Sequence, residues 1–460
     1  MGKPSAIAAD TPIRAEDLEA VLDTLLTRAK HYGADNADAI ATHGRSLSVA
    51  VREGALEDVD NSEGKDIGLR VMIGQRSASV SSSDLSDMSI DMLAERAVAM
   101  ARLAPEDPYM GLAPTELLQT NSDHGLELFD GSTTTPAKLK SRALELEAAT
   151  LGVKSVAQAE GCNASWSTSA VYFKTSHGFG GGWRSSRHGI SAMALASDEN
   201  GAMERDYDYD GARWLGDIKS PAEIGRSAGE RVIRRLGAKQ LASGSLPVIF
   251  ERRVAGSLIS AFMGAINGAA IARGTSFLKD AMGTQIFKAG TTITDDPYMV
   301  RGHGSRPWDG EGVAGVKRNL IEDGKLTTWL LNTSAAKQLD LTTTGHAVRG
   351  IAGAPGISTT NAFLSPGTQS PAELCAEMGS GLWITEMFGP SLNANTGDYS
   401  VGVAGFNVEN GVMTHPVSEV TIAGNLKEMF ASLTPANDLE FDGSTVAPTV
   451  RVEGLTLAGT

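Results

Sequence analysis

The sequence predicts an α+β protein in which N-terminal α/β segments with antiparallel sheets precede a larger, mixed and strand-rich C-terminal domain. Three features support this fold class. Residues 15–104 follow a helix, strand meander, helix order, which is typical of an antiparallel sheet accompanied by helices. Residues 136–240 place long alternating segments between two helices. Residues 245–460 combine helical stretches with many strands that glycines punctuate.

The length of 460 residues implies more than one domain. A single hydrophobic core rarely serves more than about 250–300 residues, so two or three domains are expected. A stretch rich in Pro, Asp, Ser and Thr marks a linker between the first two. We predict a disordered N-terminus at 1–14, an N-terminal α+β domain at 15–104, a linker at 105–135, a middle α+β segment at 136–240 and a C-terminal domain at 245–460.

The helix predictions rest on apolar spacing and on terminal signals. Residues 15–33 carry one apolar stripe and end at Gly33, which can adopt the left-handed conformation that stops a helix. A second helix is capped near Asp84 or Ser89 and continues to about Leu103. Further helices are predicted at 136–151, 221–236 and 254–270.

Strands are predicted where apolar and polar residues alternate. The first run covers residues 46–51, and a turn at Asn61–Gly64 then leads into a strand at 67–73. A turn at Gly74-Gln75 leads into a strand at 77–80. Further strands are predicted within 153–210, between turns at 177–182 and 198–201, and at 326–331 and 417–422.

Composition and charge argue against several functional classes. The net charge of -15 opposes direct nucleic-acid binding, which requires Lys and Arg to neutralise phosphates. Cys162 and Cys375 are the only cysteines, too few for a disulfide framework, and they suggest a reducing compartment. We find neither a signal peptide nor an apolar run of membrane-spanning length. We therefore expect a soluble, cytoplasmic protein that binds neither nucleic acid nor a membrane.

Three short motifs resemble ligand-binding loops but lack the context that such loops need. Gly310–Gly315 matches a dinucleotide fingerprint, but a strand-like run follows it, so we expect a plain turn. Gly178–Gly182 is as glycine-rich as a phosphate loop, but no Lys-Ser or Lys-Thr follows, and a hairpin tip is the preferred interpretation. Asp206–Gly211 with Asp217 comes close to an EF-hand loop, but the surrounding pattern is that of a strand. We expect a solvated strand face there.

His303 is the histidine with the most suggestive surroundings. It stands near Arg301, Arg306 and Asp309 in a loop bounded by Gly and Pro, and such a loop can line a cleft. We favour the alternative, a surface loop held by salt bridges. Cys375 falls in a helix-like segment and is most simply a small core residue. A Cys-His nucleophile pair is the other alternative, without local support.

The most informative stretch of the chain is Glu251–Ser276. It contains the predicted helix Val254–Ala270, which carries apolar residues at helical spacing but no His, Glu, Asp or Cys. Together with Asn393–Ser400, Ala404–Gly411 and Pro416–Asn425, this stretch resembles the TldD/PmbA family of proteases. The resemblance extends over nearly the whole chain.

In that family, the TldD branch carries a His-Glu-x-x-x-His zinc motif on this helix, whereas the PmbA (TldE) branch lacks it. A zinc ion held by a helix needs two donors about one turn apart and a nearby carboxylate that activates the bound water. The chain therefore resembles the PmbA branch. We assign no catalytic residue and no metal ligand to it, and its substrate-binding residues stay unassigned.

The resemblance implies a non-catalytic subunit that joins a zinc-containing, TldD-like subunit in a cytoplasmic metalloprotease for unfolded peptides and small proteins. The family's older label, modulator of DNA gyrase, then reflects a genetic effect of this processing. A homodimer is expected when the chain is alone. Edge strands among the Gly-rich strands of residues 290–425 are expected to contact substrate backbone. The alternative from another class is an independent homodimeric hydrolase whose site is assembled from residues dispersed in the sequence.

Overall fold

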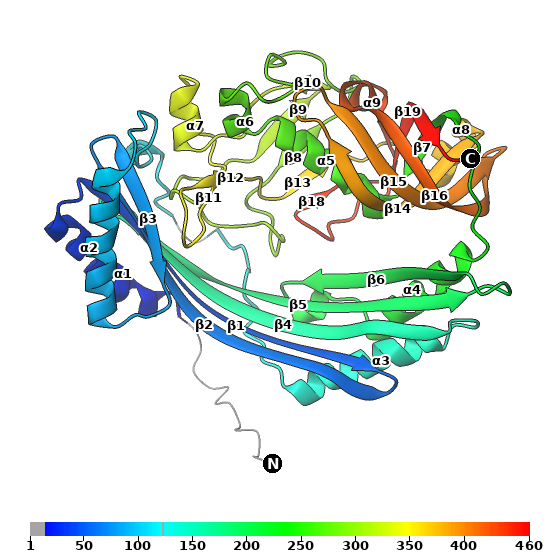
Figure 1. Cartoon of the computed structure of the whole chain (residues 1–460), viewed down its shortest axis with the longest axis horizontal. Coiled ribbons are helices and arrows are strands. Elements are labelled where there is room, and N and C mark those ends of the chain that lie inside the picture. The colour runs from blue at the N-terminus through cyan, green and yellow to red at the C-terminus, as the bar shows by residue number, and fades with distance from the viewer. Residues whose placement is uncertain (1–13, 122–123) are drawn as a thin grey trace.

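The computed structural model describes residues 14–121 and 124–460. The molecule has two layers: a long, curved sheet built from the N-terminal half, and a strand-rich C-terminal domain that lies over the concave side of this sheet (Figure 1). The predicted α+β fold class is confirmed. The segment predicted to be disordered, residues 1–14, lies outside the described residues except for Arg14.

The N-terminal sheet is antiparallel throughout and has the strand order β3-β2-β1-β4-β5-β6. Its strands are β1 (Asn36–Arg52), β2 (Ala55–Ile73), β3 (Arg76–Ser82), β4 (Gln158–Thr175), β5 (Gly180–Ser197) and β6 (Met203–Ala212). β1 pairs with β4 from Asp38 opposite Thr175 to Val51 opposite Cys162. The first and middle segments of the chain therefore share one continuous sheet.

Helices cover the outer, convex face of this sheet (Figure 1). They are α1 (Glu19–Tyr32), α2 (Asp87–Leu103), α3 (Pro136–Leu151) and α4 (Pro221–Arg235). The short 3-10 turns η1 (Glu16–Leu18), η2 (Thr115–Leu117) and η3 (Leu215–Asp217) lie in the connecting segments. The odd-numbered apolar residues of β1 face these helices: Ala39 packs among α1 and α2, and Val49 among α3 and α4. Because neighbouring residues of a strand point to opposite faces, its even-numbered residues face the C-terminal domain.

The predicted N-terminal helices are confirmed, and their ends follow from local capping. Gly33 has a φ of 103° and ends α1 in the left-handed conformation. α2 begins after Ser86, whose side chain accepts a hydrogen bond from the backbone of Ser89. α4 begins with a capping box in which Ser220 and Glu223 satisfy each other's backbone N–H groups.

The predicted turn at Asn61–Gly64 is wrong, because these residues lie within β2 and pair with Gly44–Leu47 of β1. The chain reverses instead at Glu53 and Gly54, where φ is 53° and 72°. Every residue from Ala55 to Asp66 is exposed, so this part of β2 needs no apolar alternation and reads as a polar loop in the sequence.

The C-terminal domain contains a six-stranded mixed sheet with the order β16-β15-β14-β7-β19-β17. Its strands are β7 (Gly244–Phe250), β14 (Gly381–Leu392), β15 (Asp398–Glu409), β16 (Val412–Asn425), β17 (Thr434–Pro435) and β19 (Val450–Ala458). β7 and β14 are parallel, the other neighbours are antiparallel, and β16 also pairs with β19. This last pairing gives the sheet a barrel-like form.

A second sheet lies beside the barrel, with the order β10-β9-β8-β13-β18. Its strands are β8 (Ile293–Asp295), β9 (Arg318–Glu322), β10 (Lys325–Leu326), β13 (Ala362–Leu364) and β18 (Thr445–Val446). β11 (Ala347–Val348) and β12 (Gly356–Ile357) form a separate two-stranded sheet. The helices are α5 (Arg252–Ala265), α6 (Gly268–Ala272), α7 (Thr333–Gln338), α8 (Pro371–Met378) and α9 (Leu426–Ser432). The predicted strand at 326–331 is wrong beyond Leu326, whereas the one at 417–422 is confirmed within β16.

The core of the C-terminal domain contains three phenylalanines at its centre. Phe262 of α5 meets the rings of Phe287 and Phe430 edge-on at centroid distances of 5.3 and 5.9 Å. Edge-to-face pairs at such distances add about 0.5–1.5 kcal/mol each beyond the area they bury. Among the described residues, the structure has no helix that is both long and apolar enough to cross a membrane.

Candidate functional site

α5, which covers most of the predicted helix Val254–Ala270, is a core element. It follows the buried end of β7 and turns Leu258, Ile259 and Phe262 into the interior, where each is 0% exposed. Its outward positions include Ser257 and Ser260, whose hydroxyls bond to backbone carbonyls of the same helix. No side chain on α5 can therefore act as a zinc ligand. Across 14–121 and 124–460, no group of three or more His, Cys, Asp or Glu residues is placed to hold a metal ion.

The prediction of one helix over Val254–Ala270 is wrong at its C-terminal end, where the chain leaves α5 and starts again as α6. Asn267 separates the two helices, and its side-chain oxygen accepts a hydrogen bond from the backbone of Ala269 at 3.0 Å. The next residue, Gly268, donates its N–H to the carbonyl of Leu330 at 2.8 Å. At this break between α5 and α6, the hydrogen bond of Gly268 attaches the chain to the segment that contains Leu330.

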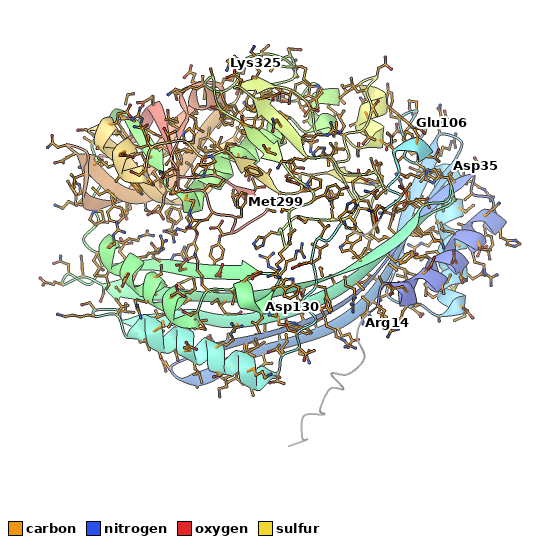
Figure 2. The ribbon with its side chains drawn as sticks, turned by 180° about the vertical axis from the view of Figure 1, so that it is seen from behind. Arg14, Asp35, Glu106, Asp130, Met299 and Lys325 are labelled. Carbon is orange, nitrogen blue, oxygen red and sulfur yellow. The ribbon has the colours of Figure 1, made fainter. Side chains whose placement is uncertain are left out.

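Two adjoining cavities lie between the concave face of the N-terminal sheet and the C-terminal domain. Their volumes are about 360 and 610 Å³, and both are lined by Arg213 and His303. Thr42 and Ser46, on the even-numbered face of β1, line the larger cavity. Figure 2 places Met299, which lines the smaller cavity, on the side of the C-terminal domain that faces the sheet. We call the two cavities together the interlayer cleft, and a junction of this kind is a common place for a ligand.

Arg213 fixes the backbone of the loop that carries His303. Its guanidinium donates to the carbonyl oxygens of Gly302 and His303 at 3.0 and 2.7 Å. Burial lowers the pKa of His303, and the charges of Arg187 and Arg213 lower it further, against an opposing effect of Asp442. His303 is therefore neutral at pH 7 and can donate or accept a hydrogen bond from a ligand.

Arg301 holds the same loop from its outer side. Its guanidinium forms ion pairs with Glu127 at 2.6 Å and with Asp217 at 3.0 Å. It also lies 4.1 Å from the ring centroid of Trp214. The predicted salt-bridged surface loop is therefore correct for Arg301.

Arg306 and Asp309 do not fit that prediction, because Asp309 is buried and Arg306 is half-buried. Asp309 is 2% exposed and accepts the backbone N–H groups of Glu311, Val313 and Ala347 at 2.8, 2.9 and 3.0 Å. Burial lowers the pKa of Arg306, and Asp309 partly offsets this effect. Neither residue lines the interlayer cleft.

These bonds shape Gly310–Gly315 into a loop, as predicted, and no helix follows it before β9. Glu311 is buried within this loop and accepts hydrogen bonds from the backbone and hydroxyl of Thr333 at 2.9 and 2.6 Å. Burial and, to a smaller extent, the nearby Asp309 together raise the pKa of Glu311 to about 7. The fingerprint glycines therefore belong to a packed turn that contains two neighbouring carboxyl groups.

Comparison with known proteins shows which family has this three-part organisation. Models of the three domains of the PmbA/TldA metallopeptidases match the chain: domain 1 at residues 37–101, the central domain at 129–236 and the C-terminal domain at 243–459. The chain belongs to the PmbA/TldD metallopeptidase family. The predicted resemblance is thereby confirmed.

Relatives in this family extend over nearly the whole chain. Metalloprotease PmbA of Escherichia coli O157:H7 is 37% identical over 445 residues, which cover 95% of this chain and 96% of that protein. A PmbA homologue of Haemophilus influenzae is 32% identical and covers 92% of both. Neither match is confined to one domain.

Solved structures show the same fold. A candidate modulator of DNA gyrase from Bacteroides thetaiotaomicron superposes with a TM-score of 0.89 at 25% identity, covering 97% of this chain and 99% of that one. TldE from Thermococcus kodakarensis has a TM-score of 0.82 at 19% identity and covers 95% and 100%, a likeness of fold alone.

In this member of the PmbA/TldD family, Asp206 lies on a buried strand face, so the prediction of a solvated face is wrong for it. It is 2% exposed and pairs with Arg253 at 2.8 Å and Arg235 at 3.6 Å. Arg235 also pairs with Glu386 of β14. The EF-hand-like aspartate of β6 therefore helps join the middle segment to the barrel.

Cys375 is confirmed as a core residue, packed among apolar side chains that include Trp383 and Phe406. The cleft residues Arg187, Arg213 and Asp442 were missed by the sequence reasoning. A signal was present for Arg187, because the alternation of Ile190, Ala192 and Ala194 along the same strand places Arg187 on the opposite face of the sheet.

Proposed function

We propose that this chain is the PmbA/TldE-type, non-catalytic subunit of a cytoplasmic TldD/TldE-type metalloprotease that degrades or processes unfolded peptides and small proteins. The observation that carries this proposal is α5. Apolar residues fill its inner face, and serine, glycine and alanine occupy most of its outer face, so it supplies neither zinc ligands nor a carboxylate for water activation. A TldD-like partner would contribute both.

The interlayer cleft supports a role in holding substrate. Half of the residues that line its larger part are Ser or Thr, among them Ser167, Ser169 and Ser185, whose hydroxyls can bond to peptide groups without selecting a side chain. A protease for many unfolded peptides needs such backbone recognition. The contact between substrate backbone and edge strands within 290–425 stays a prediction.

The independent hydrolase has less support. Such an enzyme would need an accessible nucleophile beside a base. Hydroxyl–histidine contacts occur at Ser132 with His188 (3.3 Å), Thr344 with His346 (2.8 Å), Thr175 with His177 (2.7 Å) and Thr414 with His415 (3.4 Å). His188, His346 and Thr175 are 2%, 2% and 4% exposed, so the first three pairs cannot reach a peptide. The exposed Thr414 donates its hydroxyl to the carbonyl of Asn407 at 3.2 Å, so its proton is not directed at His415.

Metal analysis of the chain purified from its native host without chelator tests the proposal. We expect less than stoichiometric zinc in this chain and about one zinc ion in a co-purifying TldD-like subunit, because only the partner carries the ligands. The partner serves as the internal control for metal loss during purification. One tightly held zinc ion per copy of this chain would contradict the non-catalytic assignment.

A further inference from the structure

We propose that Arg187 and Arg213 form a carboxylate-binding site in the interlayer cleft that holds an acidic group of a bound peptide. This inference rests on the proposed function, because it assigns the substrate chemistry of the same cleft. The acidic group is either the C-terminal carboxylate of the peptide or an Asp or Glu side chain.

Arg213 is a partly buried cation without a carboxylate partner. It follows β6, and its guanidinium donates hydrogen bonds to the backbone carbonyls of Gly302 and His303. Such bonds orient the guanidinium but leave its charge uncompensated. Burial and the nearby charge of Arg187 together lower the pKa of Arg213 to about 10, which reflects the cost of this placement.

Arg187 adds a second unpaired charge to the same cavity. It extends from β5, is exposed, and lines the cavity of about 610 Å³ together with Arg213. Among the described residues, no Asp or Glu oxygen lies within 4.0 Å of either guanidinium. By contrast, Arg70 is paired with Asp38, and Arg253 with Asp206 at 2.8 Å.

Two like charges facing one cavity repel each other unless an anion enters between them. The planar guanidinium matches a carboxylate through two parallel hydrogen bonds, so a pair of arginines can hold one carboxylate firmly. Arg45, a third arginine of this cavity, is already engaged by Glu63 at 3.0 Å. The free positive charge is thus concentrated at Arg187 and Arg213.

The surroundings supply further donors for such a ligand. Ser169 and Ser185 line the cavity and hydrogen-bond to each other at 2.9 Å. Hydroxyl groups can rotate to donate to the carboxylate lone pairs that the arginines leave free. Asp66, at the far strand β2, is the one carboxylate among the residues that line this cavity.

Fluorescence anisotropy with labelled unfolded peptides tests the site directly on the full chain. In the first pair, both peptides lack Asp and Glu, and one ends in a free carboxylate and the other in an amide. In the second pair, both peptides end in an amide, and one carries an internal Glu and the other an internal Gln. The protein variants are wild type, Arg187→Gln, Arg187→Lys, and Arg96→Gln as a matched control. Arg96 is exposed on α2, on the outer face of the sheet, so its loss changes the net charge equally.

We expect wild type to bind at least one acidic peptide roughly tenfold more tightly than its neutral counterpart. The pair that shows the preference identifies the source of the carboxylate. Arg187→Gln should lose the preference, Arg187→Lys should keep part of it, and Arg96→Gln should keep all of it.

Equal binding of all four peptides, or a preference that survives Arg187→Gln, would overturn this inference while leaving the proposed function intact. Absence of binding by any peptide would overturn both. The chain could also show a binding preference that depends on Arg187 and yet support no proteolysis when it is mixed with a TldD-like partner. This result would support the carboxylate-binding site and refute the proposed function.

Discussion

The buried carboxyl group of Glu311 makes the stability of the C-terminal domain dependent on pH. The substitution Glu311→Gln keeps the shape of the side chain and an oxygen that can accept the hydrogen bonds of Thr333, but it removes the ionisable group. The neighbouring Asp309 keeps its three backbone hydrogen bonds in the variant. The exchange therefore isolates the effect of one charge.

The sign follows from the raised pKa. Folding raises the pKa of Glu311 from 4.5 to about 7, so the native state favours the protonated form. This contribution to stability is fully present below pH 4.5 and is lost as the pH rises through about 7. At about 1.36 kcal/mol per pH unit, the difference corresponds to roughly 3 kcal/mol at pH 8.

Urea unfolding followed by circular dichroism from pH 5 to pH 8 measures this effect. We expect Glu311→Gln and wild type to have similar free energies of unfolding near pH 5, and the variant to be more stable by up to roughly 3 kcal/mol at pH 8. Glu428→Gln, at an exposed position on α9, is the matched control and should show no such trend. A stability difference that is constant from pH 5 to pH 8 would refute the reasoning.

Two further predictions concern the core and the assembly. Phe262→Ala removes a fully buried ring that contacts Phe287 and Phe430. It should lower the free energy of unfolding, measured by thermal unfolding, by about 3–5 kcal/mol. The control Ser260→Ala, on the exposed face of the same helix, should change it little. A loss below about 1 kcal/mol for Phe262→Ala would contradict the core role of α5. Light scattering at micromolar concentration should show a two-fold homodimer of the 48.0 kDa chain, and a monomer would count against that prediction.

The elements that sequence reasoning located well are those whose signals are local. Gly33 and Ser220 act within a few residues of the helix ends that they define, so their effect is readable without the fold. The same holds for the absence of ligating side chains on α5, which is a property of one helix. The position of Asn61–Gly64 within β2 was not readable, because the strand there is exposed on both faces.

The interlayer cleft could not be predicted because residues far apart in the sequence build it. Arg187 comes from β5 and Arg213 follows β6, and they meet a loop from the C-terminal domain that carries His303. Asp206 was misjudged for the same reason, since its partners Arg235 and Arg253 lie on α4 and α5. Alternation indicates that a side chain faces away from the helices, but the layer that covers it becomes visible only in the fold.

Reconstituted proteolysis distinguishes a non-catalytic subunit from an independent hydrolase. An unfolded reporter peptide would be incubated with this chain alone, with a subunit that carries the His-Glu-x-x-x-His motif alone, and with both together. We expect cleavage only in the mixture and its loss on addition of a chelator. Full activity of the zinc subunit alone, or chelator-insensitive cleavage by this chain alone, would contradict it.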